Sequence, residues 1–120
     1  MYPYRSFKNK FTFTQRYEES SRVLSKYPDK LPIICEPSLT SRNFCPLVDK
    51  RKYLVSRDLT IGEFLFVIKN KLRLNPEKAL FIFVNNIIPS TSSSIEQIYY
   101  RYRDDDGFLY LLYVEENVFG

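Results

Sequence analysis

The glycine carboxylate at the end of this sequence is the group best suited to chemistry. The segment Phe108–Gly120 reads FLYLLYVEENVFG, an alternating apolar stretch followed by a short acidic turn and a bare glycine. Glycine has no Cβ and tolerates backbone conformations closed to other residues, so such a tail can enter a narrow enzyme channel and be activated at its carboxylate. Glycine also makes up about 7% of residues in proteins, so an ordinary chain boundary is the alternative interpretation.

The other reactive residue types argue against an enzyme. The sequence has no histidine, which excludes Ser-His and Cys-His catalysis and histidine-ligated zinc. Two cysteines alone cannot close a zinc site. Cys35 lies in an apolar run, where a buried and unreactive thiol is expected, whereas Cys45 lies in a predicted loop and is the more reactive candidate. We expect no catalytic residue, no metal and no cofactor.

Length and charge describe one small domain with a basic first half. The 120 residues, 44% of them hydrophobic, suit a single core. Apolar runs are far shorter than the ~20 residues that span a bilayer, which predicts a soluble, cytoplasmic protein. Up to Arg57 there are twelve Lys/Arg against five Asp/Glu, and then six against nine. This asymmetry favours an acidic partner on the first half and, less specifically, nucleic acid or an anionic membrane.

The first half of the chain contains the elements that must position these groups. A helix is predicted from an N-cap at Thr14 to Lys26, ahead of Pro28. Strands are predicted at Leu31–Glu36 and Lys52–Ser56. Asp58 or Thr60 caps the next helix, whose apolar side is formed by Ile61, Phe64, Leu65, Ile68 and Leu72.

The second half alternates strand and helix. Ala79–Val84 is nearly continuous in apolar residues, which predicts a central strand buried on both faces. Asn85-Asn86 supplies a turn that tolerates left-handed backbone. A helix capped by Ser93 or Ser94 runs through Tyr102. A charged turn and a closing strand, Leu109–Val114, follow it.

This order of elements predicts an α+β fold, the ubiquitin-like β-grasp, in which a helix packs across one face of a mixed four-stranded sheet. Residues 1–30 form an N-terminal helical extension and residues 31–120 the β-grasp core, in one compact domain overall. The lead Met1–Lys10, with Tyr2, Tyr4 and Phe7, either packs on this domain or contacts a membrane.

Five motifs then occur in a fixed order: KYPDKLPIICE at 26–36, DKRKYLV at 49–55, DLTIGEF at 58–64, FIFVNN at 81–86 and DGFLY at 106–110. Together they resemble the GABARAP-type autophagy modifiers, the autophagy-related protein eight family. The resemblance covers about Phe11 to Gly120. It departs from the family at Ser56, where proline is usual, and in the longer loop 37–48, so partner preference is expected to differ.

The resemblance implies a protein modifier whose Gly120 is adenylated, carried as a thioester by activating and conjugating enzymes, and joined to phosphatidylethanolamine. A processing and delipidating cysteine protease is a further implied partner. Two acyl chains, each contributing roughly 0.8 kcal/mol per buried CH₂, make such an anchor stable. The protein would then pass from the cytoplasm to autophagosome or related membranes and act in autophagy and protein transport.

The resemblance also implies capture of acidic aromatic-x-x-aliphatic peptide motifs of receptors and adaptors, added as an extra strand along Lys52–Ser56. The implied aromatic pocket comprises Glu19, Val23, Pro32, Ile34, Lys52, Leu54 and Phe108. The implied aliphatic pocket comprises Tyr53, Val55, Leu59, Phe64 and Val67. The acidic flank of the motif would meet Lys30, Lys50, Arg51 and Lys71.

Each of these assignments has a purely structural alternative. Ile34, Leu54, Phe64 and Val67 also suit core packing, and the basic run at 50–52 suits a solvated surface. The run at 81–83 is either a second partner surface or a buried strand. Tyrosines 99, 100 and 102 suit helix packing better than base stacking, and we expect no nucleic-acid binding. The rival function is an unconjugated ubiquitin-like scaffold in vesicle trafficking or organelle maintenance.

Overall fold

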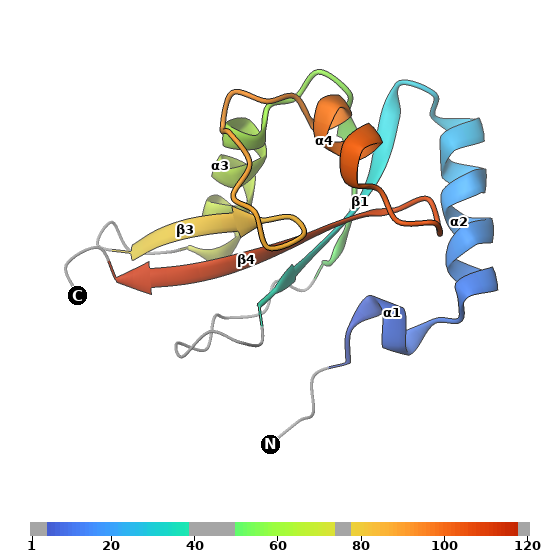
Figure 1. The fold of residues 1–120 in the computed structure, drawn as a ribbon, viewed down its shortest axis with the longest axis horizontal. Coiled ribbons are helices and arrows are strands. Elements are labelled where there is room, and N and C mark those ends of the chain that lie inside the picture. Colours follow the sequence, from blue (N-terminus) through green and yellow to red (C-terminus); the bar gives the residue numbers. More distant parts are fainter. Residues whose placement is uncertain (1–4, 39–49, 74–77, 118–120) are drawn as a thin grey trace.

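The protein is represented by a computed structural model that describes residues 5–38, 50–73 and 78–117 (Figure 1). Each main helix and strand predicted from the sequence is present, and a short N-terminal helix is added. The elements are α1 (Phe7–Lys10), α2 (Phe13–Lys26), β1 (Lys30–Pro37), β2 (Lys52–Ser56), α3 (Ile61–Leu72), β3 (Lys78–Phe83), α4 (Ile95–Tyr102) and β4 (Leu109–Asn117).

One four-stranded sheet in the order β2-β1-β4-β3 organises the fold. β1 runs antiparallel to β2 and parallel to β4, and β3 runs antiparallel to β4. The sheet is therefore mixed, which confirms the predicted α+β, ubiquitin-like β-grasp with its N-terminal helical region.

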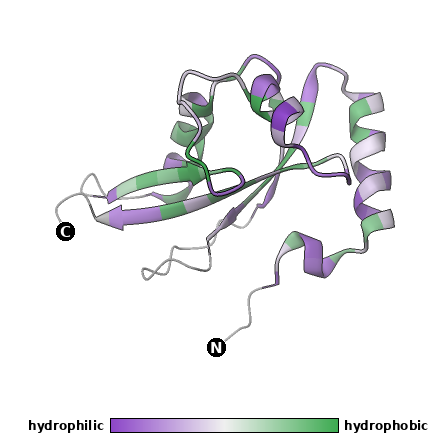
Figure 2. Ribbon diagram, viewed as in Figure 1, coloured by the Kyte–Doolittle hydropathy of each residue, from purple (hydrophilic) through white to green (hydrophobic). Residues whose placement is uncertain are grey.

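The position of β3 corrects one prediction. The apolar run Ala79–Val84 predicted a central strand, but β3 lies at the edge and β4 inside the sheet. Figure 2 shows β3 as largely hydrophobic, whereas β4 becomes hydrophilic toward its C-terminal end. Only alternate β3 positions face the core: Leu80 and Ile82 are buried, and Phe81 is 37% exposed. Apolar content alone did not distinguish two-sided burial from an edge strand with an outward aromatic residue.

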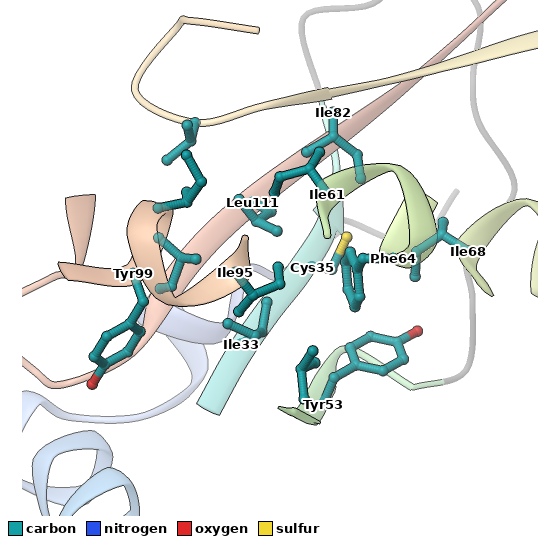
Figure 3. Close-up of a cluster of buried hydrophobic side chains, with 14 of the residues drawn as sticks. Ile33, Cys35, Tyr53, Ile61, Phe64, Ile68, Ile82, Ile95, Tyr99 and Leu111 are labelled. Carbon is teal, nitrogen blue, oxygen red and sulfur yellow. The ribbon is translucent and has the colours of Figure 1, made fainter. Parts of the chain in front are cut away.

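α3 and α4 cover one face of the sheet and build the main core with it (Figure 3). Ile33 of β1 and Leu111 of β4 point toward Phe64 of α3 and Ile95 of α4, and all four are buried. Cys35 is buried in the same cluster, and burial raises the pKa of its thiol. The prediction that this thiol is buried is confirmed.

α1 packs against the opposite face of β1. Phe7 is buried with Ile34 and Phe108, and the Phe7 and Phe108 ring centroids lie 5.2 Å apart. The Phe7 amide also donates a 2.9 Å hydrogen bond to Glu36 Oε2. Packing on the domain is therefore the correct alternative for Phe7, while residues 1–4 lie outside the described part of the chain.

Three helices begin with a reciprocal capping box, formed by Thr12 for α2, Thr60 for α3 and Ser94 for α4. The predicted start of α2 at Thr14 is wrong by two residues. Thr12 is the cap because Gln15, three positions later, donates its amide to the Thr12 hydroxyl and accepts from the Thr12 amide.

Candidate functional site

β2 lies at one margin of the sheet and presents its two sides to different surroundings. Tyr53 and Val55 are buried in the core beside α3, whereas Lys52 and Leu54 are exposed, Leu54 to 41%. The Lys52 ammonium forms an ion pair with Glu19 of α2. β2 therefore has two sides: the α3 side, to which Tyr53 and Val55 point, and the α2 side, to which Lys52 and Leu54 point.

The backbone of β2 directs alternate hydrogen-bonding groups away from the sheet. The Cys35 amide donates to the Arg51 carbonyl at 2.8 Å, so Arg51 is at a position that bonds to β1. In an antiparallel pair, residues of one parity bond to the neighbouring strand and those of the other parity point away. The N–H and C=O groups of Lys52 and Leu54 consequently face outward. Within the described ranges, no strand other than β1 pairs with β2.

Five of the seven residues predicted for an aromatic pocket are connected through β2, since Lys52 pairs with Ile34, Leu54 pairs with Pro32 and Lys52 meets Glu19. Leu54 exposes apolar surface, whereas Ile34 and Phe108 are fully buried in one cluster with Phe7. The Lys52–Glu19 ion pair connects β2 to α2 here. The set comes from α2 (Glu19, Val23), β1 (Pro32, Ile34), β2 (Lys52, Leu54) and the residue before β4 (Phe108).

The five residues predicted for an aliphatic pocket divide into three that are buried and two that are partly exposed. The Tyr53 and Phe64 rings meet edge to face with centroids 5.5 Å apart, and burial raises the pKa of Tyr53 to about 12. These two residues and Val55 are buried. Leu59 is half-buried and Val67 is 38% exposed, so they are the residues that present apolar surface.

A hollow of about 640 Å³ starts at Leu59 and Val67 and continues beyond the predicted pocket. Gly62 and Phe66 line it from α3, and Thr91 and Ser92 line it from the loop that precedes α4. Sequence reasoning missed this continuation because backbone contacts bring the loop to α3. Glycine near the start of a helix was the available signal, since glycine in a helix often marks a close backbone approach.

Two of the predicted basic residues converge on the start of β2. The ammonium groups of Lys50 and Lys71 lie 5.2 and 5.9 Å from the centre of the Tyr53 ring. Lys30 lies at the other end of the strand and donates a 3.0 Å hydrogen bond to the hydroxyl of Ser56. Ser56, which departs from the family pattern, thus has a lysine partner.

Arg51 is already engaged within the chain. Its Nη1 lies 3.3 Å from Glu36 Oε2 and donates a hydrogen bond to the Arg5 carbonyl. The same carboxylate oxygen of Glu36 accepts from the Phe7 amide. Arg51 therefore connects the N-terminal segment to the sheet, and its contact with an acidic ligand stays a prediction.

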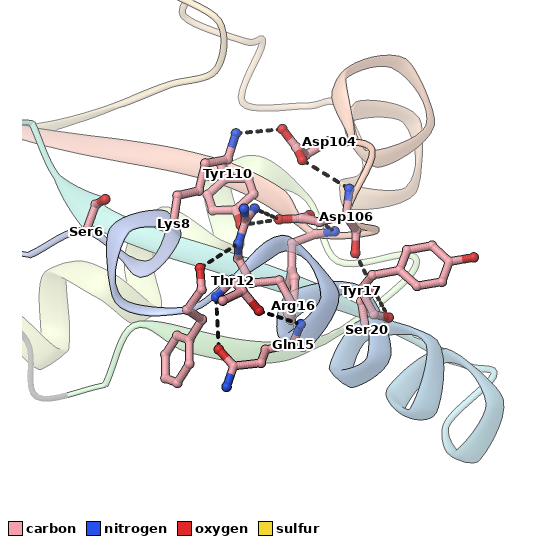
Figure 4. Close-up of polar contacts among 12 residues, drawn as sticks. Ser6, Lys8, Thr12, Gln15, Arg16, Tyr17, Ser20, Asp104, Asp106 and Tyr110 are labelled. Atoms are coloured by element: carbon pink, nitrogen blue, oxygen red, sulfur yellow. Dashed lines mark hydrogen bonds and ion pairs between the residues drawn. The ribbon is translucent and has the colours of Figure 1, made fainter.

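A buried carboxylate, predicted only as part of a charged turn, connects α2 to β4 (Figure 4). Asp106 is fully buried, and its Oδ2 accepts 2.5 Å hydrogen bonds from Arg16 Nη1 and the Tyr110 hydroxyl. Its Oδ1 accepts from the Phe108 amide at 2.8 Å, and Ser20 donates to its carbonyl. Burial and the bond to Asp106 raise the pKa of Tyr110. This network fixes the position of Phe108.

Several predictions concern groups beyond the described residues. Gly120, Cys45 and most of the loop 37–48 lie there. In the described part of the chain, no three His, Cys, Asp or Glu side chains gather in a way that could hold a metal ion. Nor does any helix in those ranges have the length and apolarity needed to cross a bilayer.

The mixed sheet, the helix across its face and the free margin of β2 define a ubiquitin-like protein. The family model for the ubiquitin-like autophagy protein Atg8 matches residues 15–120. Autophagy-related protein 8 of Mycosarcoma maydis is 47% identical over 115 residues, which cover 96% of both chains. The chain therefore belongs to the Atg8 family.

Two solved structures extend the likeness to three dimensions. Trypanosoma brucei ATG8 superposes with a TM-score of 0.87 at 37% identity, covering 98% of this chain and 100% of that one. Plasmodium falciparum Atg8, solved in complex with an Atg3 peptide from the same organism, gives a TM-score of 0.83 at 32% identity, covering 92% and 96%.

Proposed function

We propose that this chain is an autophagy modifier rather than an enzyme, joined through Gly120 to phosphatidylethanolamine and recruiting receptors and adaptors by their acidic aromatic-x-x-aliphatic motifs. The observation that carries the proposal is the free margin of β2, where the N–H and C=O groups of Lys52 and Leu54 face outward between two apolar sides. A peptide strand added there gains backbone hydrogen bonds whatever its sequence.

The spacing of the motif fits the two sides of β2. Successive side chains of a strand point to opposite faces, so residues three positions apart also point to opposite faces. An aromatic residue beside Leu54 on the α2 side would therefore place the aliphatic residue at Leu59 and Val67 on the α3 side. The acidic flank would then meet Lys50 and Lys71, which adds modest, salt-sensitive steering.

Conjugation would follow acyl-transfer chemistry at the Gly120 carboxylate. ATP adenylates the carboxylate with loss of pyrophosphate, and a cysteine thiolate of the activating enzyme displaces AMP. The acyl group passes to a cysteine of the conjugating enzyme, and the lipid amine then forms an amide and releases that thiol. The Atg3 peptide in the Plasmodium falciparum complex supports a similar contact with a conjugating enzyme for this chain.

The conjugation is tested by incubating the protein with activating and conjugating enzymes, ATP and phosphatidylethanolamine liposomes. A lipidated band is expected, and Gly120→Ala should abolish it. Unchanged lipidation of the Gly120→Ala protein would overturn the proposed attachment. Absence of lipidation together with intact peptide binding would instead favour the unconjugated scaffold.

The peptide site is tested with two leucines of equal exposure. Leu54 and Leu112 are each 41% exposed, but Leu54 lies on β2 and Leu112 on β4. Leu54→Arg should weaken binding of an acidic aromatic-x-x-aliphatic peptide at least tenfold, about 1.4 kcal/mol, by calorimetry. Leu112→Arg should leave it unchanged. Equal effects of the two substitutions on peptide affinity would show that the peptide does not bind at β2.

A further inference from the structure

We propose that the hollow beyond Leu59 extends the peptide site and selects ligands that carry an apolar residue and then a lysine or arginine after the aliphatic position. The inference rests on the proposed peptide binding at β2. The hollow would be a second specificity element that prefers a cationic ligand residue, whereas the start of β2 prefers the acidic flank of the ligand.

The hollow is formed before any ligand arrives, because backbone hydrogen bonds fix its two walls. The Gly62 amide donates to the Thr91 carbonyl and the Ile61 amide to the Ser93 carbonyl, both at 2.9 Å. A Cβ at Gly62 would lie 3.2 Å from the Thr91 carbonyl oxygen, so glycine permits this close approach. Figure 1 shows the loop before α4 running beside α3. A preformed site spares a ligand the cost of ordering it.

The hollow offers apolar surface that the fold does not use. Phe66 is 64% exposed, more than any other large hydrophobic side chain among the described residues. Phe64 and Ile68 already supply the core contacts of α3. Phe66 lines the hollow beside Val67. A concave site with an exposed aromatic wall is suited to an apolar ligand side chain.

The charge of the hollow is opposite to that of the start of β2. Glu63 is the only ionisable residue among those that line it. Hydrogen bonds from the amide and hydroxyl of Thr60 lower the pKa of Glu63, which keeps the exposed carboxylate ionised. Lys71 lies in the last turn of α3 and Glu63 in the first, about 12 Å apart along the axis. A cationic group is therefore complementary to the far end of the site.

The direction of the peptide connects this charge to the motif. A ligand with its aromatic residue beside Leu54 and its aliphatic residue at Leu59 runs parallel to β2 and leaves over α3. A strand advances about 3.3 Å per residue, so the next three residues cover about 10 Å. The apolar residue and the cation are therefore expected within about three positions after the aliphatic one.

The test compares three peptides by calorimetry: the core motif alone, the core extended by an apolar residue and lysine, and the same extension with glutamate for lysine. The lysine-extended peptide should bind up to about tenfold more tightly than the core, for an apolar contact of about 60 Å². The glutamate-extended peptide should bind about two- to fivefold more weakly than its lysine counterpart, as a surface charge pair allows.

Two substitutions test whether these gains in peptide affinity come from the hollow. Phe66→Ser should remove the gain from the extension, and Phe81→Ser, an exposed aromatic on the opposite edge strand, should leave it intact. Glu63→Gln should remove the preference for lysine over glutamate, since glutamine can still complete the Thr60 capping box. Both hollow variants should bind the core peptide as the unsubstituted protein does.

The outcomes separate the inference from the function beneath it. If the core peptide binds but the extensions add nothing, or Phe66→Ser and Glu63→Gln leave their gains unchanged, the hollow is not a peptide subsite. If the core peptide does not bind, the proposed peptide recognition fails and the hollow with it. Shifts of the Gly62 and Thr91 amide resonances with the lysine-extended peptide alone would locate the contact directly.

Discussion

Gly107 is the residue at which side-chain packing and backbone geometry most clearly require glycine. Its φ is 90°, and a Cβ there would lie 2.3 Å from Ser20 Oγ. Gly107→Ala should therefore lower the free energy of unfolding by about 1–3 kcal/mol, measured by urea denaturation. Ser20→Ala removes the Oγ contact but leaves the Ser20 Cβ at 3.0 Å and the backbone cost, so the double variant should be less destabilised than the sum of the single ones. A Gly107→Ala protein as stable as the unsubstituted one would contradict this reading.

Asp104 should give the fold a local pH dependence. Its Oδ1 accepts a 2.6 Å hydrogen bond from the Lys8 ammonium. Burial alone would raise its pKa, but the bonds from Lys8 and the Asp106 amide lower it overall. A carboxyl whose pKa is lower in the folded protein than in the unfolded chain stabilises the fold at pH values above its unfolded pKa of about 3.9. That stabilisation is lost as the pH falls through the folded-state pKa.

The corresponding prediction concerns the slope of stability with pH. Asp104→Asn should flatten the fall in unfolding free energy below about pH 5, measured by denaturation at several pH values. Asp105→Asn, at the exposed neighbour, should leave the slope unchanged. Identical slopes for the unsubstituted protein and Asp104→Asn would show that the Lys8 contact has no energetic role.

At the scale of elements, a buried ion pair contributes to the attachment of α2. Asp106 is fully buried, and the Arg16 side chain that meets it is only 11% exposed. Asp106→Asn leaves a nearly buried guanidinium without its counter-charge and should cost about 3 kcal/mol. Amides of α2 should then exchange faster with solvent, whereas Asp105→Asn should leave them unchanged. Unaltered exchange in Asp106→Asn would place the attachment of α2 elsewhere.

Local sequence signals predicted most elements because their causes lie within a few residues. Asn85 and Asn86 adopt φ of 47° and 64°, as the predicted left-handed turn requires. Thr60 and Ser94 are caps because each has a glutamate or glutamine three positions later. The place of β3 in the sheet could not be predicted in this way, since strand order depends on long-range pairing.

The same distinction applies to the candidate site. The resemblance assigned Lys52 and Leu54 to one pocket and Tyr53 and Val55 to the other, and the burial of β2 alternates in the same way. The engagement of Arg51 by Glu36 and the approach of Thr91 to Gly62 join segments distant in sequence, and no local pattern encodes them. For the residues of β2 itself, strand periodicity explains why Tyr53 and Val55 are buried while Lys52 and Leu54 are exposed.

At the scale of the whole molecule, the sheet is closed on its faces and open at the margin of β2. α3 and α4 cover the main core, and α1 covers the second apolar cluster with Phe7. Among the described residues, β2 pairs with β1 alone. On the proposed function, a ligand strand would therefore add at this margin without displacing core contacts.

Amide hydrogen exchange along β2, followed by NMR with and without a saturating acidic aromatic-x-x-aliphatic peptide, tests strand addition most directly. In the free protein the Lys52 and Leu54 amides should exchange rapidly, and Tyr53 and Val55, bonded to β1, slowly. The peptide should slow Lys52 and Leu54 at least tenfold, about 1.4 kcal/mol of protection. Unchanged exchange of Lys52 and Leu54 in the saturated complex would contradict docking at this margin.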